Sequence, residues 1–184
     1  MNDESIPRTK TLLILGGARS GKSRYAQKLA EASGKSPVLI ATASVGDAEM
    51  AKRIGKHQAD RGTHWRLIEE EIDVAGALSR EAAADKVIVV DCLTLWLSNL
   101  MLGSYDVENH CDALARSVAS LAGPAIFVSN EVGFGIVPES ALGRAFRDAQ
   151  GRLNQALASV CDAVVLVVAG LPLQLKPGAV TLRL

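Results

Sequence analysis

A short apolar segment followed by a glycine-rich run constrains this chain more than any other feature. Thr11–Leu15 reads Thr-Leu-Leu-Ile-Leu, and the run after it fits the pattern G-x-x-x-x-G-K-[ST]. Glycines in such a run let the backbone curl and point its amide N–H groups at phosphate oxygens, while Lys22 reaches the β- and γ-phosphates and the Ser23 hydroxyl ligates Mg²⁺. A helix beginning near Lys22 adds its positive end to this site. The pattern predicts nucleoside triphosphate binding, although a glycine-rich turn that merely joins a strand to a helix is the alternative. The predicted phosphate-binding residues are Gly16, Gly17, Ala18, Arg19, Ser20, Gly21, Lys22 and Ser23.

Several other segments are apolar at every position rather than at every second one. Strands with this pattern are covered on both faces, as in a mainly parallel sheet. They alternate with segments of helical composition, which is typical of a doubly wound α/β architecture. We therefore expect a single P-loop NTPase-like α/β domain over residues 11–184, preceded by a polar extension, residues 1–10, that we expect to be flexible. The predicted strands are residues 11–15, 38–41, 65–69, 87–91, 125–128 and 163–168, and the predicted helices are residues 22–32, 48–60, 74–84, 93–102, 106–121 and 140–160.

The composition excludes several classes of function. Twenty Lys and Arg residues balance twenty Asp and Glu residues, so no net field recruits nucleic acid or an anionic membrane surface. The most apolar run, residues 93–102, is too short to span a bilayer, and the N-terminus lacks the apolar stretch of a signal peptide. Three widely spaced cysteines without a C-x-x-C pair are typical of core residues in a reducing compartment. We expect a cytoplasmic protein with no nucleic-acid partner and no membrane span.

The strand predicted at residues 87–91 ends in an acid, Asp91. Ligands of open α/β sheets bind at the carboxyl ends of the strands, and an acid in this position coordinates Mg²⁺ in P-loop proteins. We therefore predict that Asp91 and Ser23 hold a Mg²⁺ ion. The alternative is that Asp91 caps the helix that starts near Leu93.

His57 lies in a basic segment, among Arg53, Lys56 and Arg61. A charge run of this kind is usually a solvated helix face. The same cations nevertheless attract phosphate, and like-charge repulsion lowers the pKa of the imidazole. A neutral imidazole is a competent nucleophile toward phosphorus, and nearby cations stabilise charge on the equatorial oxygens. His57 is therefore a candidate for covalent catalysis.

Further segments carry a more specific signal than the glycine-rich run. They are Ile40-Ala41-Thr42-Ala43, Arg53-Ile54-x-x-His57, Val89-Val90-Asp91-Cys92-Leu93-Thr94 and Val128-Ser129-Asn130-Glu131-Val132-Gly133-x-Gly135-Ile136-Val137-Pro138. Together, from about Leu12 to Lys176, the chain resembles the bifunctional adenosylcobinamide kinase/adenosylcobinamide-phosphate guanylyltransferase family of cobalamin biosynthesis. The first ten residues are additional to the family pattern, and the tail from Leu171 onward matches it only loosely.

The resemblance implies two successive reactions. Such enzymes phosphorylate the aminopropanol hydroxyl of adenosylcobinamide with ATP or GTP. They then take GMP from GTP onto a histidine, which corresponds to His57, and pass it to adenosylcobinamide phosphate to make adenosylcobinamide-GDP. The family also implies Mg²⁺ as cofactor and a homo-oligomer, with a trimer as its form. Besides Gly16–Ser23, the implied nucleotide site comprises Ala41, Thr42, Ala43, Gln58, Ala59, Asp60, Arg61, Glu69 and Asp91.

Three questions stay open from the sequence alone. Glu131 can hold Mg²⁺, accept the proton of the substrate hydroxyl, or shape its own loop through backbone hydrogen bonds. A P-loop small-molecule kinase without guanylyl transfer, and a nucleotide-dependent switch ATPase or GTPase, are alternatives to the bifunctional enzyme. An apolar group on the segment 93–102 either forms a contact surface between subunits or packs internally; its members are Leu95, Trp96, Leu100 and Met101.

Overall fold

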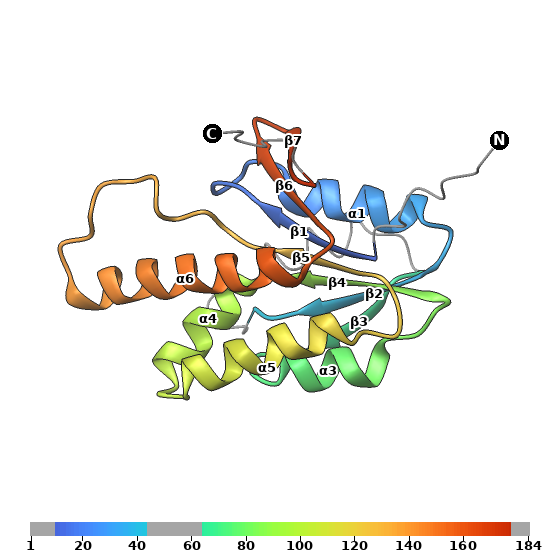
Figure 1. Ribbon diagram of the computed structural model, residues 1–184, viewed down its shortest axis with the longest axis horizontal. Coiled ribbons are helices and arrows are strands. Elements are labelled where there is room, and N and C mark those ends of the chain that lie inside the picture. The colour runs from blue at the N-terminus through green and yellow to red at the C-terminus, as the bar shows by residue number, and fades with distance from the viewer. Residues whose placement is uncertain (1–9, 44–63, 178–184) are drawn as a thin grey trace, which may run out of the picture.

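The six predicted strands and one further strand come together in one seven-stranded sheet (Figure 1). The computed structural model describes residues 10–43 and 64–177. The order across the sheet is β3-β2-β4-β5-β1-β6-β7, and neighbouring strands are parallel except for the antiparallel pair β6 and β7. The mainly parallel α/β architecture is therefore confirmed. The strands are β1 (Thr11–Leu15), β2 (Ser36–Ala41), β3 (Arg66–Glu69), β4 (Lys86–Asp91), β5 (Ala125–Val128), β6 (Ala163–Val168) and β7 (Leu171–Lys176).

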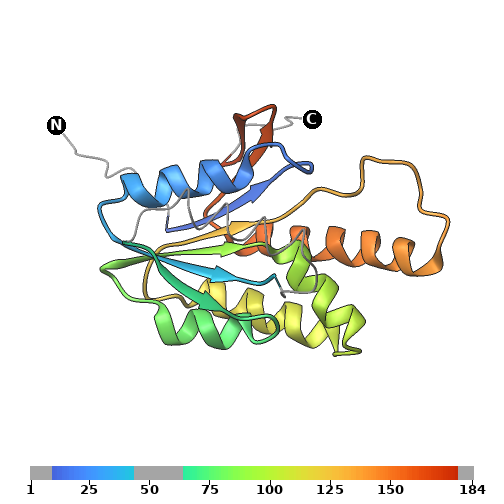
Figure 2. The same ribbon diagram turned by 180° about the vertical axis from the view of Figure 1, so that it is seen from behind.

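Both faces of the central part of the sheet are covered, which explains why β4, β5 and β6 are largely apolar. In β4, Ile88 and Val90 belong to one buried cluster and Val87 and Val89 to the other. Because side chains alternate along a strand, these two sets point to opposite faces. The second cluster packs against α1 (Lys22–Ala32). The other face carries α3 (Val74–Glu81), α4 (Leu93–Leu102), α5 (Val107–Ala119) and α6 (Ala141–Val160), as Figures 1 and 2 show from opposite sides.

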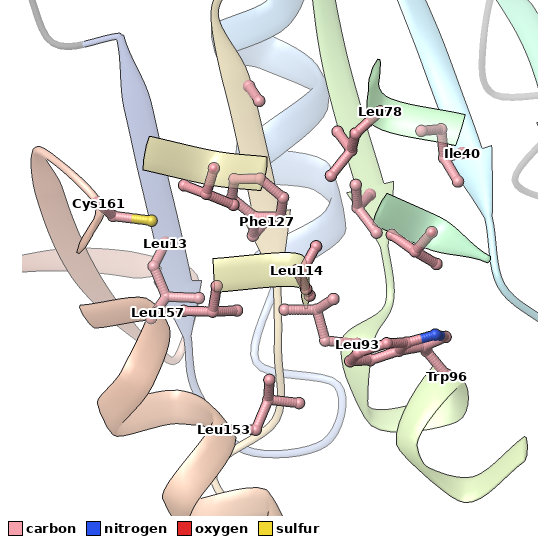
Figure 3. Packing of buried hydrophobic residues seen from close by; sticks show 14 of the residues in the cluster. Leu13, Ile40, Leu78, Leu93, Trp96, Leu114, Phe127, Leu153, Leu157 and Cys161 are labelled. Atoms are coloured by element: carbon pink, nitrogen blue, oxygen red, sulfur yellow. The ribbon is translucent and has the colours of Figure 1, made fainter. Parts of the chain in front are cut away.

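The larger cluster contains most of the bulky side chains, among them Trp96 and Phe127 (Figure 3). Trp96 is 1% exposed, and its indole N–H donates to the carbonyl of Ile72 at 2.8 Å. Leu100 is fully buried on the same helix, and Met101 packs against the cluster. Trp96, Leu100 and Met101 therefore pack internally, whereas Leu95, the fourth member of this apolar group, is half-buried and belongs to neither buried cluster.

Strand β7 was not predicted from the sequence. Pro172 lies in it. Because proline has no backbone N–H to donate to a neighbouring strand, its presence argues against a central strand. The structure resolves the conflict by placing β7 at the edge of the sheet. The signal that identifies it is Ala169-Gly170 followed by leucine at every second position, which is typical of a two-residue hairpin leading into a strand.

Two further predictions need comment. The helix expected over residues 74–84 ends at Glu81, because Ala82 adopts an extended conformation (φ −64°, ψ 119°) as the chain turns toward β4. The helix expected over residues 48–60 and the extension up to residue 9 lie outside the described residues.

None of the helices within the described ranges combines the length and the apolar composition that crossing a membrane requires.

Candidate nucleotide-binding site

The glycine-rich run leaves β1 at the switch point of the sheet. From β1 the chain crosses through α1 to β2 on one side, whereas β6 lies directly against β1 on the other side. Ligands of open α/β sheets bind beside such a point, at the carboxyl ends of the strands. Gly16–Ser23 lies at this edge, because Gly16 directly follows the last residue of β1.

The run forms the curled loop that its sequence predicts. Gly16 and Gly21 have φ angles of 151° and 103°, and Arg19 adopts a left-handed φ of 57°. The amide of Ser20 donates to the carbonyl of Gly17 at 3.3 Å, which closes the turn. Helix α1 follows directly, and its first turn contains no acidic residue that would repel a bound anion. The positive end of the helix and the loop amides thus form a single anion-binding surface.

Two polar groups inside the loop fit phosphate oxygens. Lys22 is 6% exposed, and its Nζ donates to the carbonyls of Gly16 at 2.9 Å and Gly17 at 2.7 Å. The Ser20 hydroxyl is buried and has no hydrogen-bond partner among the described residues. A buried hydroxyl without a partner costs about 1–3 kcal/mol. A phosphate oxygen in the loop would give the Ser20 hydroxyl a partner and the Lys22 ammonium a further acceptor.

Asp91 is electrostatically coupled to this loop. It ends β4, which is separated from β1 by β5. Burial lowers the pKa of Lys22, whereas Cys92 and Asp91 raise it. The charge of Asp91 thus partly offsets the effect of burial on the pKa of Lys22. Mg²⁺ usually takes only one or two protein carboxylates, with phosphates and waters completing its shell. The hydroxyl of Ser23 and the carboxylate of Asp91 fit that donor set.

The turn between β6 and β7 packs against the glycine-rich loop, a contact that was not predicted from the sequence. Ala169 and Gly170 have φ angles of 52° and 81°, as in a two-residue hairpin turn of type I′. The amide of Gly170 donates to the carbonyl of Ser20 at 2.8 Å. A Cβ at Gly16 would overlap the carbonyl oxygen of Val167, and one at Gly21 would lie 3.2 Å from the Cα of Gly170. The hairpin and the loop therefore fit together only if these positions are glycine.

Alanine substitution of Gly16 and of Gly17 should have different effects on stability, because only Gly16 is packed against the hairpin. We expect Gly16→Ala to lower the free energy of unfolding by about 2–3 kcal/mol, since it combines a positive φ with a backbone overlap. At Gly17 an added Cβ meets nothing within 4 Å, so Gly17→Ala should change the free energy of unfolding by less than about 0.5 kcal/mol. Denaturant unfolding of both variants measures the difference. Equal stabilities would contradict the contact between the loop and the hairpin.

The predicted residues at the end of β2 lie at the same edge of the sheet. Thr42 is fully buried between Ala41 and Ala43. Its hydroxyl donates to the carbonyl of Cys92 at 2.6 Å and accepts from the amide of Cys92 at 3.0 Å, and the amide group of Asn99 donates to the carbonyl of Thr42 at 2.8 Å. Thr42 therefore joins the ends of β2 and β4, and its hydroxyl is used for hydrogen bonds within the protein.

The remaining predicted residues are placed less favourably or not described. Glu69 is exposed at the end of β3, and β2, β4 and β5 separate that strand from β1. The sheet thus does not bring Glu69 next to the glycine-rich loop. His57, Gln58, Ala59, Asp60 and Arg61 lie outside the described residues.

The cysteines are not suited to nucleophilic chemistry. All three are unpaired, and Cys161 is buried. Burial raises the pKa of Cys92 and of Cys111 to about 11, and that of Cys161 to about 12. Because the thiolate is the reactive form, these thiols are protonated and inert at neutral pH.

A buried polar network at the end of β5 was also missed from the sequence. The Ser129 hydroxyl donates to Asn154 Oδ1 at 2.7 Å and accepts from Gln150 Nε2 at 2.9 Å. Both partners are buried on α6. The available signal was the spacing of Gln150 and Asn154, which places two amides on one helix face. The network fixes the chain as it leaves β5 beside the glycine-rich loop.

Comparison with known proteins finds relatives over nearly the whole chain. Residues 12–175 match the CobU family, described as cobinamide kinase / cobinamide phosphate guanyltransferase. The bifunctional adenosylcobalamin biosynthesis protein CobP of Pseudomonas aeruginosa is 49% identical over 166 residues, which cover 89% of this chain and 96% of that protein. The corresponding protein CobU of Salmonella typhimurium is 37% identical over 182 residues, which cover 90% of this chain and 99% of that protein.

A solved structure shares the fold at low sequence identity. A prototypical ATPase from the type III secretion system of pathogenic bacteria superimposes with a TM-score of 0.54 at 13% identity, covering 90% of this chain and 56% of the ATPase. This likeness shows the fold alone. The family match and the two relatives go further: the chain belongs to the CobU family of cobinamide kinases / cobinamide phosphate guanyltransferases.

Proposed function

We propose that this chain phosphorylates adenosylcobinamide and then converts the product to adenosylcobinamide-GDP, as a bifunctional enzyme of adenosylcobalamin biosynthesis. The observation that carries the proposal is the match of residues 12–175 to a family named for both activities. The loop around Lys22 supports the use of a nucleoside triphosphate, because it holds a buried ammonium and a Ser20 hydroxyl that has no partner within residues 10–43 and 64–177.

In the first reaction the aminopropanol hydroxyl attacks the γ-phosphorus of ATP or GTP. Lys22 and the amides of Gly16–Ser23 bind the β- and γ-phosphates and stabilise the charge that develops on them. Ser23 and Asp91 would hold Mg²⁺, which, when bound, neutralises charge on the same oxygens. Phosphoryl transfer needs positioning and electrostatic stabilisation more than covalent chemistry, and these side chains supply both.

In the second reaction a neutral His57 attacks the α-phosphorus of GTP. A nitrogen–phosphorus bond forms, the bond to the pyrophosphate breaks, and pyrophosphate leaves. A phosphate oxygen of adenosylcobinamide phosphate then attacks the same phosphorus and releases the imidazole. The covalent intermediate splits one displacement into two easier ones. Contacts to the nucleotide from Ala41–Ala43, Gln58–Arg61 and Glu69 are part of this proposal.

The proposal extends to assembly and location. The family resemblance implies a homo-oligomer with a trimer as its form, which light scattering of the purified protein measures. A cytoplasmic location rests on the three unpaired, widely spaced cysteines, which suit a reducing compartment.

Product analysis tests the proposed function. The protein is incubated with adenosylcobinamide, Mg²⁺ and either ATP or GTP, and the corrinoids are separated by liquid chromatography and mass spectrometry. With GTP we expect adenosylcobinamide phosphate to appear first and adenosylcobinamide-GDP to follow. Accumulation of the phosphate alone would identify a kinase without guanylyl transfer. Triphosphate hydrolysis that does not depend on the corrinoid would identify a nucleotide-dependent switch.

A further inference from the structure

The two proposed reactions place different demands on a base. In the first, the acceptor is an alcohol, which must lose its proton as it attacks phosphorus. In the second, the acceptor is a phosphate monoester whose second pKa is about 6, so that it is mostly ionised at pH 7. A general base is therefore required for phosphorylation and not for guanylyl transfer. A side chain that acts as this base should affect one activity and spare the other.

Glu131 follows β5 and lies directly beside the phosphate loop. β5 lies between β1, which carries the phosphate loop, and β4, which ends in Asp91. The chain that leaves β5 therefore emerges between these two groups, and the amide of Glu131 donates to the carbonyl of Gly16 at 3.0 Å. Among the acids that follow a parallel strand in the described ranges, Asp91 is one strand further from β1 and Glu69 lies on the outermost strand, β3. Of these three acids, Glu131 is thus the one whose backbone is hydrogen-bonded to the loop.

The backbone that carries Glu131 is held firmly. The amide of Asn130 donates to Thr94 Oγ1 at 2.8 Å, and the carbonyl of Asn130 accepts from Asn154 Nδ2 at 3.1 Å. Together with the bond from Glu131 to Gly16, these contacts tie the segment to α4, α6 and the phosphate loop. A group held by such contacts needs little reorganisation when the substrate reacts.

The Glu131 carboxylate is oriented by one hydrogen bond and can still accept others. Its Oε1 accepts from the amide of Gly133 at 2.8 Å, and the residue is half-buried. A carboxylate has two oxygens and about four acceptor sites. The bond from Gly133 therefore orients the group and leaves room for an alcohol, so loop shaping and proton transfer are compatible roles.

The loop that starts at Glu131 also offers surface for a bulky acceptor. Phe134, Ile136 and Val137 are 84%, 98% and 59% exposed. The segment extends away from the sheet between β5 and α6 (Figure 1), and Arg144 holds its far end by donating to the carbonyls of Pro138 and Glu139 at 3.0 and 2.6 Å. A corrinoid resting on these apolar side chains would present its alcohol near the base of the loop.

From this geometry, and resting on the proposed function, we infer that Glu131 is the general base of the kinase reaction. The alcohol O–H bond breaks and its proton passes to the Glu131 carboxylate as the oxygen bonds to the γ-phosphorus. The bond from that phosphorus to the bridging oxygen breaks, and the electron pair leaves with the nucleoside diphosphate. The protonated Glu131 then returns its proton to water. A general base typically contributes 10²- to 10⁴-fold to a rate.

The test compares Glu131→Gln with Glu139→Gln, which changes an exposed acid at the other end of the same loop. Each variant is assayed for phosphorylation of adenosylcobinamide and, separately, for conversion of supplied adenosylcobinamide phosphate with GTP. We expect Glu131→Gln to slow phosphorylation by about 100-fold or more, with guanylyl transfer changed by less than about threefold. Glu139→Gln should retain both activities. Glu131→Asp, which keeps the carboxylate, should recover part of the phosphorylation rate.

Each other outcome overturns the inference. If Glu131→Gln phosphorylates at the wild-type rate, the carboxylate is not the base. If both activities fall together while the thermal midpoint stays that of the wild type, Glu131 shapes the phosphate site rather than moving a proton. A lowered midpoint with a parallel loss in Glu131→Asp assigns it a structural role. Failure of the proposed function is distinguished by the wild-type protein, which would then phosphorylate no adenosylcobinamide at all.

Discussion

Replacing His57 by alanine should abolish guanylyl transfer while phosphorylation of adenosylcobinamide continues. Without an imidazole no phosphorus–nitrogen bond can form, so the two-step route through the covalent intermediate is lost. Removal of an enzyme nucleophile typically costs several orders of magnitude in rate, so we expect a loss of at least about 1000-fold. The measurement is the conversion of supplied adenosylcobinamide phosphate with GTP, followed by chromatography of the corrinoids.

A second histidine provides the control. His110 lies on α5 and contacts the ring of Tyr105 with centroids 5.8 Å apart. It takes no part in the proposed chemistry, so His110→Ala should retain guanylyl transfer. Equal guanylyl transfer by His57→Ala and His110→Ala would contradict a covalent role for His57. Absence of guanylyl transfer from the wild-type protein as well would indicate the kinase-only alternative.

Lys22→Met should impair both reactions, in contrast to the selective effect at His57. Both proposed reactions pass through transition states with charge on phosphate oxygens, and the Lys22 ammonium lies buried inside the loop that would hold them. Loss of one such charge-stabilising group costs about 10²- to 10³-fold in kcat. Methionine keeps an apolar side chain of similar length, so the packing around the stem is largely preserved. Initial rates of both activities, with the thermal midpoint as a check on folding, measure the effect.

Lys28→Met is the matched control, because Lys28 is an exposed lysine on the same helix, α1. It should leave both rates within about twofold of the wild type, since an exposed side chain away from the loop makes little difference to the site. If Lys22→Met kept both rates while Lys28→Met did the same, the loop would not be the site of either reaction.

The parts of the fold that follow from local chemistry were predictable. The run 87–91, apolar up to its final Asp91, and the fully apolar run 163–168 predict buried parallel strands, and β4 and β6 are such strands. The spacing of Gly16, Gly21 and Lys22 predicts a curled loop at a helix start, and the φ angles and buried ammonium confirm it. In each case one short segment contains the whole physical cause.

Contacts between distant segments were harder to predict. The hairpin at Gly170 contacts Ser20, which is 150 residues away in the sequence, and neither segment contains a sequence signal for this contact. Gln150 and Asn154 carry a helical spacing, but their partner Ser129 is identified only once α6 packs beside β5. Asp91 was predicted at a strand end, whereas its electrostatic effect on Lys22 depends on the order of the strands across the sheet.

The covalent intermediate itself can be observed by mass spectrometry of the intact protein. Wild-type protein is incubated with GTP and Mg²⁺ in the absence of corrinoid and analysed beside His57→Ala. The wild type should gain the mass of one GMP residue, and mild acid should remove it, because a phosphorus–nitrogen bond is acid-labile. His57→Ala should gain nothing. A wild-type protein that stays unmodified, or a His57→Ala variant that is modified to the same extent, would contradict guanylyl transfer through His57.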